Sequence, residues 1–229
     1  GMDFDGSYGE YTVLPKSIVS PFHSALAWPT LGALPEMFQT AHGSLYSALG
    51  VKRGERLLIR GGTSSVGLLA TQMAAAEGIT VIATTRTPEK RAVLLKNGAS
   101  DVLIDQGVLR DNLPQSVDKV LELVGTTTLG DSLRCVRPGG TVCMAGMLSE
   151  QWSMKDFSPM DFIPSSVNLT IYDSGQMRVE PSAFQEFLNR VSAGEITPPI
   201  KAVFRLDQIN EAHRLMESNS GAGKIVVYL

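Results

Sequence analysis

From about residue 56 the chain alternates between short apolar stretches typical of strands and longer stretches with the apolar spacing of amphipathic helices. The short stretches are rich in β-branched residues and are bounded by turn-forming residues, as in buried parallel strands. We expect strands at residues 56–59, 80–85, 101–105, 118–125, 139–146 and 167–175. Strands that alternate with helical segments predict an α/β fold with a doubly wound parallel sheet, the Rossmann arrangement.

The helical segments carry recognisable start and stop signals. Between residues 66 and 77 the apolar positions follow helical spacing, and several of them are alanines that allow close packing on a sheet. The next helix is expected between Thr87 as N-cap and Gly98 as C-terminal stop, with Pro88 in its first turn. These signals place a helix after each of the first two strands.

The two ends of the chain do not follow this alternation. Prolines punctuate the first 35 residues, and after Gly194 the pattern predicts a strand, a helix beginning near Asp207 and a closing strand. We expect both ends to belong to a second, smaller subdomain. The expected boundaries are 1–35 for the N-terminal part, 36–178 for the α/β domain and 179–229 for the C-terminal part.

Composition and charge narrow the classes of function. Of the 229 residues, 43% are hydrophobic and 19% are charged, which is typical of a globular domain with a real core. The net charge of -3 gives no electrostatic case for nucleic acid or an anionic membrane. No apolar run approaches the roughly 20 residues that span a bilayer. The polar N-terminus, and Cys135 and Cys143 without metal-type spacing, predict a reducing, cytoplasmic compartment.

A glycine-rich turn separates the first strand from the first helix. The letters G-T-S-S-V-G match the dinucleotide fingerprint G-x-G-x-x-G with serine at the second glycine. The residues of this turn are Gly62, Thr63, Ser64, Ser65, Val66 and Gly67. We expect the N–H groups of Ser65, Val66 and Gly67 to face a diphosphate, because amides in the first turn of a helix lack intrahelical partners. The alternative is a plain tight turn without a ligand.

The end of the second strand bears on which dinucleotide would bind. An NAD enzyme would have an acid there for the ribose diol, but the position near Thr85 carries none. Arg86, Thr87 and Lys90 follow instead, and cations with hydroxyls suit a 2′-phosphate. The sequence therefore favours NADP(H) over NAD(H). The alternative is that Arg86 and Lys90 are ordinary solvated surface charges.

Several motifs together resemble a known family. They are the T-A-x-G-S-L segment at residues 40–45, the glycine turn, V-R-P-G-G-T-V at 136–142 and the G-A-G-K tail at 221–224. In combination they are similar to the medium-chain dehydrogenase/reductase superfamily, and most of all to its zinc-independent quinone oxidoreductase (zeta-crystallin-like) branch. The likeness covers nearly the whole chain and implies the same Rossmann fold.

The resemblance implies further coenzyme-binding positions. Thr40 would approach the nicotinamide, and Arg86, Thr87 and Lys90 match positions that bind the 2′-phosphate in NADPH-using members. The ends of the fourth and fifth strands would line the path between ribose and nicotinamide. These ends comprise Val124, Gly125, Thr126, Ala145, Gly146 and Met147, with Ile171, Tyr172 and Asp173 as weaker candidates on the sixth strand.

The resemblance also implies how the ends and the partner surfaces are organised. Family members begin with a long β-rich domain, so residues 1–35 and 179–229 are expected to be remnants of a GroES-like β subdomain that lacks most of its catalytic part. The zinc ligands of the zinc branch lie in the part without a counterpart here, so no metal site is assigned. The strand within Val167–Gly175 is expected to form a homodimer by extending one sheet into the next.

Two classes of function follow. The first is a zinc-independent oxidoreductase that transfers hydride from NADPH to a small quinone or an α,β-unsaturated carbonyl. The second is an NADP(H)-binding module without turnover of its own. No catalytic residue can be named, although His42 lies near the expected nicotinamide end and could touch substrate. A methyltransferase is disfavoured because its acidic ribose-binding residue is also lacking.

Overall fold

The computed structural model describes residues 6, 8–218 and 221–229, and its central feature is a six-stranded, all-parallel sheet. The strands are β1 (Arg56–Arg60), β2 (Thr80–Thr85), β3 (Asp101–Ile104), β4 (Val117–Glu122), β5 (Val136–Met144) and β6 (Asn168–Ile171). Their spatial order is β3-β2-β1-β4-β5-β6. This order confirms the doubly wound Rossmann fold and puts its switch point between β1 and β4.

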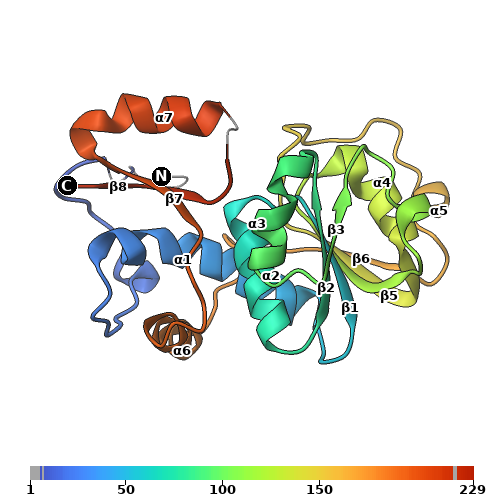
Figure 1. Cartoon of the computed structure of the whole chain (residues 1–229), viewed down its shortest axis with the longest axis horizontal. Coiled ribbons are helices and arrows are strands. Elements are labelled where there is room, and N and C mark those ends of the chain that lie inside the picture. Colours follow the sequence, from blue (N-terminus) through green and yellow to red (C-terminus); the bar gives the residue numbers. More distant parts are fainter. Residues whose placement is uncertain (1–5, 7, 219–220) are drawn as a thin grey trace. The chain divides into compact units, whose positions relative to one another are not determined.

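Helices cover both faces of this sheet. The helical segments that follow β1, β2 and β4 are α2 (Ser65–Ala76), η3 (Pro88–Lys90) with α3 (Arg91–Lys96), and α4 (Thr126–Cys135). Shorter segments are η4 (Arg110–Asn112) and α5 (Pro159–Phe162). Helices α2 and α3 lie on one side of the sheet and α4 on the other (Figure 1). The chain winds outward from β1 in one direction and from β4 in the other, so right-handed crossovers require this arrangement.

The core lies between the central strands and α4. Leu58 of β1, Val120 of β4 and Val142 of β5 are fully buried at the middle of the sheet. Leu129 and Leu133 of α4 pack into the same apolar cluster. These strands read as nearly continuous apolar runs because both faces of a parallel sheet are covered. The core therefore fixes the carboxyl ends of β1, β4 and β5 relative to one another.

The segment before β1 joins the sheet through one close approach. Helix α1 (Trp28–His42) runs directly into a π-helical turn, η2 (Gly43–Ala48). A Cβ on Gly43 would lie 2.0 Å from Cζ of Tyr172, which follows β6. Only glycine permits this packing without displacing the ring. Gly43 and Tyr172 therefore anchor the turn against the end of β6.

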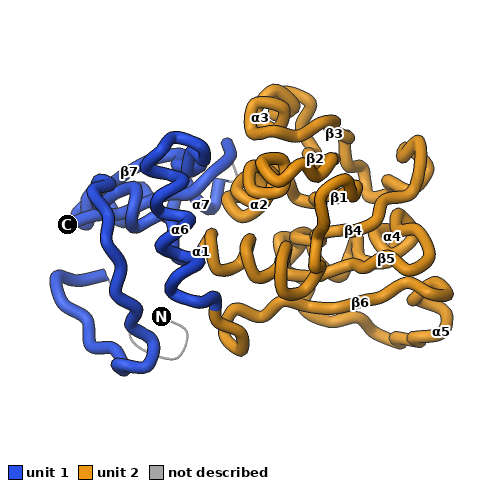
Figure 2. Tube along the Cα trace, turned by 90° about the horizontal axis from the view of Figure 1, so that it is seen from below, with its two compact units in different colours: residues 1–36, 179–229 blue, residues 37–178 orange. Residues whose placement is uncertain are grey.

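The chain divides into two compact units, which Figure 2 distinguishes. Unit 2 comprises residues 37–178 and holds the six-stranded sheet, and unit 1 combines residues 1–36 with residues 179–229. Unit 1 contains η1 (Lys16–Ile18), α6 (Pro181–Ser192), β7 (Ile200–Arg205), η5 (Leu206–Gln208), α7 (Ile209–Glu217) and β8 (Lys224–Tyr228). Unit 1 combines the two terminal parts of the chain. That it is a remnant of a GroES-like β subdomain stays a prediction.

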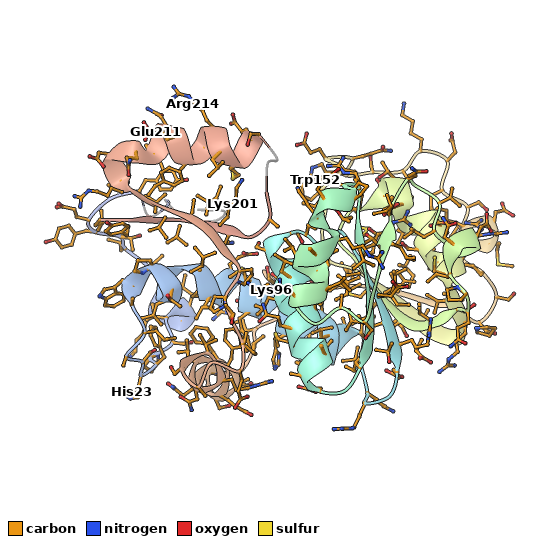
Figure 3. The ribbon with its side chains drawn as sticks, viewed as in Figure 1. His23, Lys96, Trp152, Lys201, Glu211 and Arg214 are labelled. Carbon is orange, nitrogen blue, oxygen red and sulfur yellow. The ribbon has the colours of Figure 1, made fainter. Side chains whose placement is uncertain are left out.

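Unit 1 is built around a two-stranded parallel ribbon. Strands β7 and β8 pair from Ile200↔Lys224 to Arg205↔Tyr228. On α7, Ala212 is buried, whereas the exposed Glu211 and Arg214 project from its outer side (Figure 3). Among the described residues, no helix combines the length and the apolar character needed to cross a membrane.

Candidate nucleotide site

The turn from β1 into α2 is shaped by three glycines. Gly61 has a φ of +82°, in the left-handed region that favours glycine. The N–H of Gly62 donates to the carbonyl of Thr84, which ties the turn to the end of β2 at 3.1 Å. A Cβ on Gly67 would lie only 2.7 Å from the carbonyl oxygen of Gly61. The helix can therefore begin directly against the strand only because residue 67 has no side chain.

Ser64 caps α2 and corrects part of the expectation from the sequence. Its Oγ accepts the N–H of Gly67 at 3.0 Å and donates to the carbonyl of Gly61 at 2.9 Å. The expectation that the Gly67 amide lacks a partner was wrong, because Ser64 caps it, and a contact of this amide with an anion stays a prediction. The amides of Ser65 and Val66 remain as the donors of the first helical turn.

A cavity of about 480 Å³ opens beside this turn, at the carboxyl ends of the strands. It is lined by Gly61, Thr63, Thr84, Thr85, Arg86, Asp105, Gln106, Gly107, Val124, Thr127, Thr128, Leu148 and Ser149. Of the residues predicted from the sequence, Thr63, Thr85, Arg86 and Val124 line it. The others do not: Thr40, Gly62, Ser64, Ser65, Val66, Gly67, Thr87, Lys90, Gly125, Thr126, Ala145, Gly146 and Met147.

The end of β2 presents one cation to the cavity. The Oγ1 of Thr84 accepts the N–H of Gly61 at 3.1 Å, and the Oγ1 of Thr85 bonds to the backbone of Thr87. The Thr84 hydroxyl thus ties β2 to the glycine turn, and the Thr85 hydroxyl stabilises the loop that follows β2. Arg86 is exposed at the rim and carries the charge that an anionic group in the cavity would meet.

An acid that the sequence reasoning overlooked stands beside that cation. Asp105 directly follows β3, lines the cavity, and donates its N–H to the carbonyl of Thr85 at 2.8 Å. Its carboxylate forms a bidentate pair with the buried guanidinium of Arg60, with N–O distances of 2.7 and 2.8 Å. The only sequence signal was that the apolar run 102–104 is followed by an acid.

Arg60 is the centre of a buried polar network below the cavity. Besides Asp105, its guanidinium contacts Asp131 at 2.7 Å and the carbonyls of Thr128 and Gly107. Burial alone would lower the pKa of Arg60, but the carboxylates of Asp105, Glu122 and Asp131 together outweigh it and the pKa is raised. A charged guanidinium therefore holds together the ends of β1 and β3 and the start of α4.

Glu122 plays a similar part at the end of β4. It is fully buried, and its Oε1 accepts the N–H groups of Val124 at 2.8 Å and Gly125 at 3.1 Å. Ser132 of α4 donates to the other oxygen. Burial raises the pKa of Glu122, which the hydrogen bonds and the charge of Arg60 offset only in part. The carboxyl group thereby fixes the loop that borders the cavity.

The loops after β4 and β5 pack tightly on each other. A Cβ on Gly125, whose φ is +112°, would lie 2.7 Å from Sδ of Met147, and a Cβ on Gly146 would lie 2.5 Å from the carbonyl of Leu123. Within the described part of the chain, the buried Oγ of Ser149 has no hydrogen-bond partner. Ser149 also lines the cavity, so this hydroxyl is a buried polar group without a protein partner at its wall.

Thr40 and His42, which were expected near the nicotinamide, do not line the cavity. Thr40 is buried in α1 and does not line the cavity. The ring of His42 packs against Phe38 at 5.0 Å and Tyr46 at 4.7 Å between ring centroids. These contacts describe a packed histidine of the helix, so its expected contact with substrate stays a prediction.

The described residues do not fit a zinc site. Among them, no group of three or more His, Cys, Asp or Glu side chains is placed to hold a metal ion. Burial raises the pKa of the thiols of Cys135 and Cys143 to about 12. Both cysteines are free and buried.

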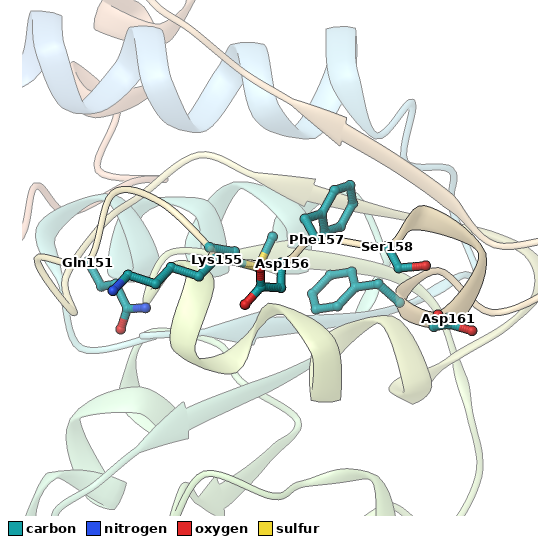
Figure 4. A pocket seen from close by; sticks show the side chains of 8 residues that line it. Gln151, Lys155, Asp156, Phe157, Ser158 and Asp161 are labelled. Carbon is teal, nitrogen blue, oxygen red and sulfur yellow. The ribbon is translucent and has the colours of Figure 1, made fainter.

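A second hollow of about 440 Å³ follows the chain between β5 and β6 (Figure 4). Phe157 and Phe162 meet edge to face within it, with ring centroids 5.2 Å apart. Lys155 and two acids, Asp156 and Asp161, also line it. It has no glycine-rich turn. The first cavity, by contrast, lies beside a glycine turn that leads from a parallel strand into a helix, and that arrangement fits a dinucleotide.

Comparisons with known proteins agree with this geometry. A family model described as zinc-binding dehydrogenase matches residues 92–227, more than half of the chain. A probable quinone oxidoreductase of Schizosaccharomyces pombe is 28% identical over 97% of this chain and 69% of its own length. A solved mycobacterial structure, described as complexed with NADPH, is 26% identical with a TM-score of 0.76, covering 94% of this chain and 66% of that one.

The description of a second solved structure names a different coenzyme. It is an NAD-dependent alcohol dehydrogenase, 25% identical with a TM-score of 0.80, over 98% of this chain and 65% of that one. The chain thus spans about two thirds of the length of each of these three proteins. The two structures point to a nicotinamide coenzyme and differ in which one.

Proposed function

This chain belongs to the zinc-binding dehydrogenase family of the medium-chain dehydrogenase/reductase superfamily, and from that premise we propose that it binds NADP(H) and serves hydride transfer to a quinone or enone. The observation that carries the proposal is the β1–α2 turn, where the absence of a side chain at Gly67 lets α2 begin directly against β1 and a cavity opens alongside. The free amides of the first helical turn then lie beside the cavity, where a diphosphate would bind.

The preference for NADPH rests on the charge at the end of β2. Arg86 lines the cavity and is exposed, so it can meet a 2′-phosphate with a charged hydrogen bond. Such a bond contributes about 1.5–3 kcal/mol, which corresponds to about 10- to 100-fold in affinity. Thr85, Thr87 and Lys90 frame the same loop. The β4 and β5 ends, including Gly125 and Gly146, would then accommodate the nicotinamide half.

Titration calorimetry of Arg86→Ala against NADPH and NADH tests this assignment. We expect NADPH to bind at least tenfold more weakly, while NADH binding stays within about twofold of the parent protein. Arg110→Ala is the matched control, because Arg110 is an exposed arginine of unit 2 that pairs only locally with Asp111. Equal losses for both coenzymes, or a loss in the control, would contradict the 2′-phosphate role.

The chemistry divides between coenzyme and protein. A bound nicotinamide supplies the hydride, and the protein's task is to hold the ring against an electrophile and to exclude water. The residues that line the cavity include no tyrosine, histidine or lysine, and its one acid is paired with Arg60. We therefore assign no proton donor to this cavity.

That lining also favours the second candidate, an NADP(H)-binding module without turnover. Absorbance of the reduced nicotinamide, followed with 1,4-benzoquinone as acceptor, distinguishes the two. Oxidation of NADPH above the rate without protein supports the oxidoreductase. Binding by calorimetry without such oxidation selects the module. Dialysis against a chelator should leave either result unchanged, because the proposal requires no zinc.

The proposal includes a homodimer through the open edge of the sheet. Strand β6 is the last strand of the order, and Ile171 at its end is 59% exposed. Open, apolar strand edges are suited to pairing with a second copy. Light scattering coupled to gel filtration should give twice the chain mass, and Ile171→Lys should shift it toward a monomer. A monomeric parent protein would exclude this interface.

A further inference from the structure

Asp105 lies beside the end of β2, where a carboxylate would affect the relative affinities for NADPH and NADH. Thr85 and Ile104 are paired in register, so Arg86 and Asp105 directly follow neighbouring strands at the same edge of the sheet. The N–H of Asp105 donates to the carbonyl of Thr85 at 2.8 Å, and both Asp105 and Arg86 line the cavity. A free acid at this edge would bind a ribose diol and repel a 2′-phosphate.

The carboxylate of Asp105 is not free. Its Oδ1 accepts from Nη2 of Arg60 at 2.8 Å and from the N–H of Gly107 at 2.9 Å. Its Oδ2 accepts from Nε of Arg60 at 2.7 Å. The side chain of Arg60 is completely buried and that of Asp105 is 7% exposed. Both oxygens are thus directed at the guanidinium rather than left for a ribose.

We infer that Asp105 is a specificity-determining residue whose charge is masked by Arg60, so that this buried pair sets the preference at the ribose 2′ position. The inference rests on the proposed dinucleotide site. While Arg60 pairs with Asp105, the carboxyl ends of β2 and β3 present the cation of Arg86 without a competing free carboxylate, and a 2′-phosphate is tolerated. Weakening the Arg60–Asp105 pair leaves a free carboxylate there, which favours the unphosphorylated ribose.

The same guanidinium provides a matched control. Asp131 pairs with Nη1 of Arg60 at 2.7 Å and accepts the N–H of Leu109 at 2.8 Å. Its side chain is 12% exposed, similar to that of Asp105, but it does not line the cavity. Asp105→Asn and Asp131→Asn each remove one negative charge from one partner of Arg60. They differ in whether that charge faces the coenzyme.

The experiment compares dissociation constants for NADPH and NADH by calorimetry in the parent protein and both variants. Asp105→Asn removes the one negative charge that lines the cavity beside Arg86, so the preference for NADPH over NADH should rise about tenfold. Asp131→Asn should leave that ratio within about threefold. A purely structural role for Asp105, anchoring the loop at residues 105–107, would weaken both coenzymes alike and leave the ratio unchanged, and that result overturns the inference.

A second variant changes the preference in the opposite direction. Arg60→Lys keeps the positive charge but cannot grip both carboxylate oxygens, because an ammonium lacks the planar fork of a guanidinium. One oxygen of Asp105 then becomes available to a ribose diol, and the ratio should move toward NADH. Should Asp105→Asn fail to fold, an unchanged ratio in folded Arg60→Lys overturns the inference by itself.

The measured dissociation constants distinguish failure of the proposed function from failure of the inference. If the parent protein binds neither coenzyme, the proposed function is wrong and the inference falls with it. If the parent protein binds both coenzymes and Asp105→Asn leaves the ratio of their dissociation constants unchanged, only the inference is wrong. If the parent protein prefers NADH while Asp105→Asn still shifts the ratio toward NADPH, the masked acid is supported and the NADP(H) assignment is not.

Discussion

Replacing Gly67 by alanine tests whether the turn between β1 and α2 is shaped for close approach of a ligand. A Cβ at this position would lie 2.7 Å from the carbonyl oxygen of Gly61 and 2.8 Å from that of Gly62. Both neighbours are backbone atoms, so neither can rotate away. Gly130 is the matched control, because it is also a helical glycine of unit 2 but its Cβ would meet only side-chain atoms of Phe162 and Arg134, at 3.2 and 3.4 Å.

The size of the effect follows from these distances. Ordinary contact begins near 3.4 Å, so the turn and the helix must separate by about 0.7 Å. Overpacking of this kind typically costs about 1–3 kcal/mol of folding free energy. The better helix propensity of alanine offsets up to about 1 kcal/mol of this. We therefore expect Gly67→Ala to be destabilised by about 1–2 kcal/mol, while Gly130→Ala stays within about 1 kcal/mol of the parent protein.

Binding should suffer more than folding. A shift of that size in Gly61 and Gly62 moves the amides of the turn away from a diphosphate, and one lost charged hydrogen bond costs about 10- to 100-fold in affinity. Urea unfolding measures the stability and calorimetry with NADPH measures the affinity. If Gly67→Ala bound NADPH like the parent protein, the turn would not hold the diphosphate and the proposed function would lose its main support.

Two further predictions concern the architecture. Gly43→Ala should cost about 1–3 kcal/mol, because its Cβ would lie 2.0 Å from Cζ of Tyr172. Adding Tyr172→Ala should recover part of that loss in urea unfolding, and strict additivity would refute the contact. Burial alone would raise the pKa of Asp118, but the N–H of Arg56 and the guanidinium of Arg137 lower it below its ordinary 3.8. Asp118→Asn should therefore be about 1 kcal/mol less stable at neutral pH, and the difference should vanish as the pH falls below that value.

Much of the fold could be predicted because its signals are local. Runs of β-branched residues and helical spacing located all six strands of the sheet, and Gly98, with a φ of +98°, ends the helical segment as expected. Boundaries were less accurate. The fourth strand was expected to extend to residue 125 but ends at Glu122, because that buried carboxyl group accepts the next amides and turns the chain.

The candidate site was only partly predictable, for a physical reason that Arg60 illustrates. From the sequence the first strand was expected to end at Ile59, the last residue of a short apolar run, and Arg60 was not expected to be part of it. In the structure Arg60 is completely buried, and it is stabilised there by Asp105 and Asp131, which lie 45 and 71 residues further along the chain. No local pattern of hydrophobic and polar positions reports such a partnership.

The sequence by itself determined the order of strands and helices, the glycine turn and the absence of an acid at the end of β2. Each of these depends on residues that are neighbours in the chain. Only the tertiary structure decided that β3 lies beside β2, so that Asp105 arrives next to Arg86 and is paired with Arg60. The charge that a ribose would meet is set by side chains from different strands, and sheet topology, rather than local spacing, brings them together.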